Sequence, residues 1–126
     1  MTDGDVVDLA TRLFGMARAG ETETLVAYLE AGAPANLTND SGDTLVMLAA
    51  YHGHAETVRA LLAAGADPNR ANDRGQTPIA GAVFKAEKDV VLALLEGGAD
   101  PAAGQPSAVA TAEMFGQVEL LALFGR

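Results

Sequence analysis

Apolar residues recur along the chain at the spacing of short amphipathic helices. Val58, Leu61 and Leu62 stand at positions i, i+3 and i+4, which places their side chains on one face of a helix. The stripe returns 33 residues later and is approximated earlier in the chain, as Val91, Leu94 and Leu95 and as Leu25, Val26 and Leu29. A glycine follows each stripe, where a left-handed residue commonly ends a helix: Gly32, Gly65 and Gly98.

A second type of helix precedes each stripe, so that the repeating unit is a pair. Thr44 and Thr77 are one period apart, and each can cap a helix because its hydroxyl accepts from a free backbone N–H. Pro78 fits the first helical position, where its missing N–H costs nothing. We expect these first helices to run to about His52 and Lys85. The segments between units are rich in Asp, Asn, Pro and Gly, which predicts turns.

Four segments of the chain follow one sequence pattern. Residues 40–54 read DSGDTLVMLAAYHGH, residues 65–69 read GADPN, residues 73–79 read DRGQTPI and residues 98–100 read GAD. They resemble the ankyrin repeat, whose pattern is roughly D-x-x-G-x-T-P-L-H-x-A-A-x-x-G-H-x-x-V-V-x-L-L-L-x-x-G-A-D-x-N. The resemblance covers about residues 5–124 and identifies the chain as similar to small, stand-alone ankyrin-repeat proteins of bacterial type.

The resemblance implies an all-α fold, an ankyrin-repeat solenoid of four stacked helix pairs joined by β-hairpin-like turns. We expect one domain over residues 1–126, with approximate units at residues 5–36, 37–69, 70–102 and 103–126. Two departures from the family pattern stand out. Met47 and Ala80 replace the usual His of the first helix, and Ala86-Glu87 replaces the Gly-His of the third unit.

The last unit is compressed. Aligning Gly53 with Gly116 gives an offset of 63 residues, three short of two periods, and makes Ser107 the cap of the last first helix. At this offset Leu121 and Phe124 take core positions, whereas the positions of Leu120 and Leu123 face outward or toward a next repeat. A helix that is apolar on several sides is normally covered.

The apolar last helix has two explanations. Weak self-association through the C-terminal helix, or a partner, would cover Leu120 and Leu123. Alternatively, a register shift turns both residues onto the preceding helix pair. The sequence leaves both explanations open.

Composition excludes several classes of function. The hydrophobic fraction is 49%, too high for an acidic disordered tail. Seventeen acidic residues against eight basic ones give a net charge of −9, so phosphate backbones and anionic membrane surfaces would repel the chain. Cys is absent, which excludes disulfides, a thiolate nucleophile and a Cys zinc site. Without an apolar run of about 20 residues or a basic leader, we expect a cytoplasmic protein.

His52 and His54 are the only histidines, and they offer one alternative chemistry. They flank Gly53, so a bent chain could bring them together for a metal-binding or hydrolytic function. A metal site needs three or four ligands, and the resemblance gives His54 a structural role. We therefore expect no cofactor, no metal and no catalytic residue, and the zinc content of untagged protein would separate the two hypotheses.

The resemblance implies that partners bind on a concave face made by the turns and the first helices. Aromatic residues, Met and Arg are enriched in interfaces, and several occupy variable positions of the family pattern here. The candidate partner-binding residues are Tyr51, His52, Arg74, Gln76, Phe84, Lys85, Met114 and Phe115. Phe84 and Phe115 could instead fold over the groove and complete the core.

The charges are unevenly distributed along the chain. Residues 59–88 hold five bases and three acids, within an otherwise acidic protein. The bases are Arg59, Arg70, Arg74, Lys85 and Lys88. Such a patch could attract carboxylates of a partner, or it could be a solvated mixture of weak charges. The sequence thus predicts a non-enzymatic protein–protein interaction module, an adaptor or regulator, whose partner is a protein.

Overall fold

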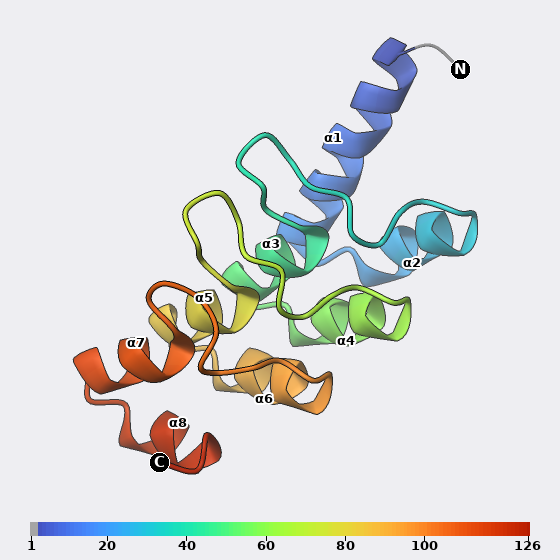
Figure 1. The fold of residues 1–126 in the computed structure, drawn as a ribbon. Coiled ribbons are helices and arrows are strands. Elements are labelled where there is room, and N and C mark those ends of the chain that lie inside the picture. The colour runs from blue at the N-terminus through green and yellow to red at the C-terminus, as the bar shows by residue number, and fades with distance from the viewer. Residues whose placement is uncertain (1–2) are drawn as a thin grey trace.

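The computed structural model describes residues 3–126, and this part of the chain folds into eight α-helices. They form four consecutive pairs, as Figure 1 shows. The helices are α1 (Asp3–Ala19), α2 (Thr22–Glu30), α3 (Leu45–Tyr51), α4 (Ala55–Ala63), α5 (Pro78–Phe84), α6 (Lys88–Glu96), α7 (Ala108–Met114) and α8 (Val118–Leu123). The prediction of an all-α solenoid of four helix pairs is confirmed.

The pairs stack in sequence order. The first helices α1, α3, α5 and α7 pack in one row, and α2, α4 and α6 pack in a second row beside it. The long turns before α3, α5 and α7 project together from one side of the stack (Figure 1). Backbone hydrogen bonds join neighbouring turns, from Asp73 N to Ser41 O (3.0 Å) and from Gln105 N to Gly75 O (2.9 Å). The repeats are therefore fixed in register at both the helices and the turns.

Polar caps begin the short first helices as the sequence predicts. Thr44 Oγ1 accepts from the backbone N–H of Met47 at 3.1 Å, and Thr77 Oγ1 accepts from that of Ala80 at 3.3 Å. Ser107 caps α7 in the same way (3.0 Å, to Ala110 N). Each cap satisfies one of the N–H groups that a helix start leaves without a partner. In residues 3–126, β pairing is limited to single bridges within two turns.

The core is periodic because equivalent residues of successive units are buried together. Val46 and Ile79 share one repeat position, and Leu61 and Leu94 share another; all four side chains are fully buried. The first helix differs from its counterparts. It begins at Asp3 and has 17 residues, where α3, α5 and α7 have seven each.

The last pair keeps the predicted offset, since α8 starts 63 residues after α4. Leu120 nevertheless does not face outward or toward a next repeat, because it is buried; it packs toward the preceding pair, as the alternative had it, but without a register shift. Its equivalent Thr57 shows the reason, because Thr57 is also buried and its hydroxyl lies 2.7 Å from Thr22 Oγ1 of the preceding pair. This position faces the previous repeat. Leu123 is exposed, and Leu121 is half-buried against the core.

Candidate functional site

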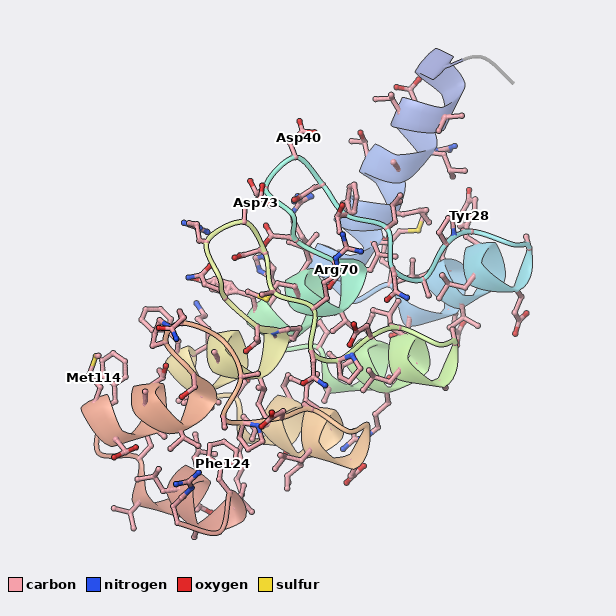
Figure 2. The ribbon with its side chains drawn as sticks, viewed as in Figure 1. Tyr28, Asp40, Arg70, Asp73, Met114 and Phe124 are labelled. Carbon is pink, nitrogen blue, oxygen red and sulfur yellow. The ribbon has the colours of Figure 1, made fainter. Side chains whose placement is uncertain are left out.

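A row of exposed large side chains marks the C-terminal ends of α3, α5 and α7. Tyr51 is 37% exposed, Phe84 56%, Phe115 53% and Met114 72%. Phe84 and Phe115 meet edge to face, with ring centroids 5.8 Å apart. Both rings therefore lie on the surface and do not complete the core. Figure 2 shows Met114 on α7 and the turn residues Asp40 and Asp73 at the tips of two successive turns.

A cavity of about 420 Å³ opens beside this row, between the turns and the first helices. Six of the eight candidate partner-binding residues line it: Tyr51, Arg74, Gln76, Phe84, Met114 and Phe115. Six further lining residues were not among the candidates: Met47, Leu48, Ala80, Gly81, Pro106 and Thr111. The cavity therefore draws on three helices and two turns that are up to 68 residues apart in the sequence.

His52 and Lys85 lie next to the cavity and not in its wall. The Lys85 ammonium sits 5.0 Å from the centre of the Tyr51 ring, a distance at which a cation is attracted to the ring face. The His52 ring packs edge-on against Tyr51, with centroids 5.7 Å apart. His52 and Lys85 thus each contact Tyr51, which itself lines the cavity.

The hollow results from two small residues of α5. Ala80 and Gly81 occupy the same repeat positions as Met47 and Leu48 of α3, 33 residues earlier. Where α3 fills the face with two large side chains, α5 presents a methyl group and a hydrogen atom. A Cβ atom added at Gly81 would lie 3.4 Å from Met47 Cε, so Met47 forms the adjoining wall. The departures from the family pattern at Met47 and Ala80 were the available signal for this feature.

A hydrogen-bond network in the turns orients the side-chain amide of Gln76, which lines the cavity. Asn72 is buried, and its Oδ1 accepts from the backbone N–H groups of Arg74 and Gln76, both at 3.0 Å. Its Nδ2 must therefore donate, and it does so to Asp43 Oδ1 and to Gln76 Oε1, both at 2.9 Å. Since the oxygen of Gln76 faces Asn72, its Nε2 is the end left to donate elsewhere.

The five bases of residues 59–88 divide into two groups. Arg59 pairs with Glu96 at 3.7 Å, and Lys88 pairs with Glu119; these pairs join α4 to α6 and α6 to α8. Arg74 lines the cavity and Lys85 adjoins it through Tyr51. No carboxylate is among the cavity-lining residues of the described chain. Arg74 is thus the one charged residue in the cavity wall of the described chain, in a protein of net charge −9.

The histidines are engaged separately. His54 Nε2 lies 2.7 Å from the backbone oxygen of Arg18, which links α4 to the preceding pair, while His52 packs on Tyr51. Within the described part of the chain, no three His, Asp or Glu side chains gather as metal ligands. Among helices α1 to α8, none has the length and apolar character needed to cross a membrane.

Comparison with known proteins matches this architecture. A family model of ankyrin repeats, three copies long, matches residues 13–104. An ankyrin-repeat protein of Pseudomonas aeruginosa is 47% identical over 51 residues, which are 40% of this chain and 30% of that protein. The matched segment thus spans less than a third of the curated relative's length.

Proposed function

The chain belongs to the ankyrin-repeat family, and on that premise we propose that it is a non-enzymatic adaptor or regulator that binds a partner protein at the concave side of its first helices. Ankyrin repeats are generally protein–protein interaction modules, and members of the family typically act by binding. The observation that carries the proposal is the row of Tyr51, Phe84, Met114 and Phe115 beside the cavity.

Exposed aromatic side chains favour this surface over the second row of helices. Aromatic and Met side chains bury a large area each and are typical of interface anchors. The second row instead carries exposed ion pairs, such as Arg59 with Glu96, which contribute little to binding or stability. The excess of acidic residues also argues against a nucleic-acid partner. A cytoplasmic location belongs to the proposal, and fractionation of native cells tests it.

The test is capture of partners from native cells, followed by affinity measurement with the purified partner. Tyr51→Ala with Phe84→Ala should weaken binding at least tenfold, because two anchors are truncated. Arg59→Ala is the matched control on the opposite row and should bind as the unchanged chain does. Thermal unfolding of all variants should be nearly the same, since none of these side chains is buried. Equal partner binding by the double variant and the control would contradict the proposal.

A further inference from the structure

The residues that line the cavity indicate which kind of partner segment it can bind. We propose that the hollow over Ala80 and Gly81 takes one large apolar side chain of the partner, and that a carboxylate of the same segment pairs with Arg74 beside it. This inference rests on the proposed function and specifies the chemistry of the segment that is bound. It commits to an acidic peptide segment with a large apolar residue.

The apolar half of the inference follows from the cavity walls. Met47 and Leu48 line one side of the hollow, and Met114 and Phe115 line it at the end of α7, so the space is lined mainly by flexible or aromatic apolar groups. An apolar side chain placed there would leave water and contact several such groups at once, which is the arrangement typical of interface anchors. Met side chains adapt their shape to the group that enters.

The acidic half follows from the donors. Arg74 is exposed, lines the cavity, and has no carboxylate within ion-pair distance among the described residues. Asn72 Nδ2 donates to Gln76 Oε1, which fixes the orientation of the Gln76 amide. The Gln76 Nε2 group therefore points away from Asn72 and can donate to a ligand. The Arg74 guanidinium and the Gln76 amide are both donors, and no carboxylate of the described chain lines the cavity. Such a set of donors suits a ligand that accepts hydrogen bonds and carries negative charge. Lys85, held on the Tyr51 ring, adds positive charge nearby.

Two variants test the hollow and one tests the charge. Gly81→Leu and Ala80→Met each introduce the residue that α3 carries at the equivalent position, so each fills the space with a side chain that the repeat accepts elsewhere. Arg74→Gln removes the guanidinium, and Arg70→Gln is its control, because Arg70 is exposed and lies outside the cavity wall. Circular dichroism and thermal unfolding check that each variant folds. If only one of Gly81→Leu and Ala80→Met folds, that variant alone tests the hollow.

The probe is a library of random 12-residue peptides displayed on phage and selected on the full chain. Selected peptides should share a large apolar residue with Asp or Glu within a few positions. As synthetic peptides they should bind at least tenfold more weakly to Gly81→Leu or Ala80→Met, severalfold more weakly to Arg74→Gln, and equally well to Arg70→Gln. Peptides without acidic residues, or peptides whose affinity survives both filled variants, would overturn the inference.

The remaining outcomes separate this inference from the proposed function. Peptides that lose affinity with Tyr51→Ala and Phe84→Ala but not with the filled variants would leave the concave face as the binding surface and reject the hollow. Peptides insensitive to all these changes, or no selected peptide at all, would count against both. Light scattering tests whether a second copy of the chain occupies the hollow: a dimer that disappears in the filled variants would overturn the assignment to a peptide segment. Decanoate tests a fatty-acid ligand: a chain that binds decanoate and no peptide would overturn the assignment as well.

Discussion

Helices α3 and α5 are built on the same scaffold and present different surfaces. Each has seven residues, begins at a capping Thr and buries its equivalent core residues, such as Val46 and Ile79. They differ at the two repeat positions that line the cavity, where α3 carries the buried Met47 and Leu48 and α5 carries Ala80 and Gly81. The scaffold is periodic because each unit must pack on the next. The cavity exists because the side-chain volume at these two positions is not periodic.

The largest expected effect separates the two sides of α5. Ile79→Ala should lower the free energy of unfolding by about 2–5 kcal/mol, because a fully buried side chain leaves a void. Phe84→Ala, on the same helix, should cost less than about 1 kcal/mol because its ring is mostly exposed. Urea unfolding of both variants measures the difference. Equal losses would contradict the division into a core side and a binding side.

The same division explains what the sequence could predict. The 33-residue period, the caps at Thr44, Thr77 and Ser107, and the four helix pairs follow from local chemistry and are confirmed. The direction of Leu120 stayed open at the level of sequence, because one helix's apolar pattern does not tell which neighbour each side faces. The equivalent residue Thr57 faces the preceding pair, but this is visible only from its contact with Thr22, which lies 35 residues away in the sequence.

The family pattern made Tyr51, Phe84, Met114 and Phe115 candidates, because it indicates which positions vary on the open side. The structure brings all four to the cavity, and their binding of a partner stays a prediction. The hollow at Ala80 and Gly81 is an absence of side-chain volume, and its shape depends on Met47, Pro106 and Thr111 from neighbouring units. No single segment of sequence contains that information.

A second prediction concerns Arg74 and Lys85, the two bases at the cavity. Arg74→Glu with Lys85→Glu should slow association with an acidic partner segment about tenfold at low salt, because two positive charges at the cavity become negative. Stopped-flow measurements at two ionic strengths should show the difference shrink as salt rises. Arg59→Glu with Lys88→Glu, which changes the charge equally on the second row of helices, is the control. If this control slows association as much, net charge and not the cavity governs the rate.

The smallest effect concerns the residue that separates the two helices of a pair. Ala86 has φ +56°, whereas the second unit has Gly53 with φ +80° at this position. Ala86→Gly should relieve the left-handed strain and raise the free energy of unfolding by about 0.5 kcal/mol, since the more flexible unfolded chain offsets part of the gain.

The reverse change is the matched control. Gly53→Ala should destabilise the protein, because a Cβ is strained at φ +80°; the Glu87 carboxylate, 2.9 Å from the new Cβ, ends a flexible side chain and can move away. Thermal unfolding measures both variants. A loss of stability in Ala86→Gly would mean that the two units do not share one backbone requirement at this turn.

The central claim is that the concave side of α3, α5 and α7 binds the partner. Hydroxyl-radical footprinting with mass spectrometry tests it in one measurement, since Met and aromatic side chains on different surfaces report together. With the captured partner bound, Tyr51, Phe84, Met114 and Phe115 should be protected from oxidation, while Tyr28 on α2 and Phe124 beyond α8 should react as in the free chain (Figure 2). Protection of Tyr28 or Phe124 with unchanged oxidation of Phe84 and Met114 would contradict the account.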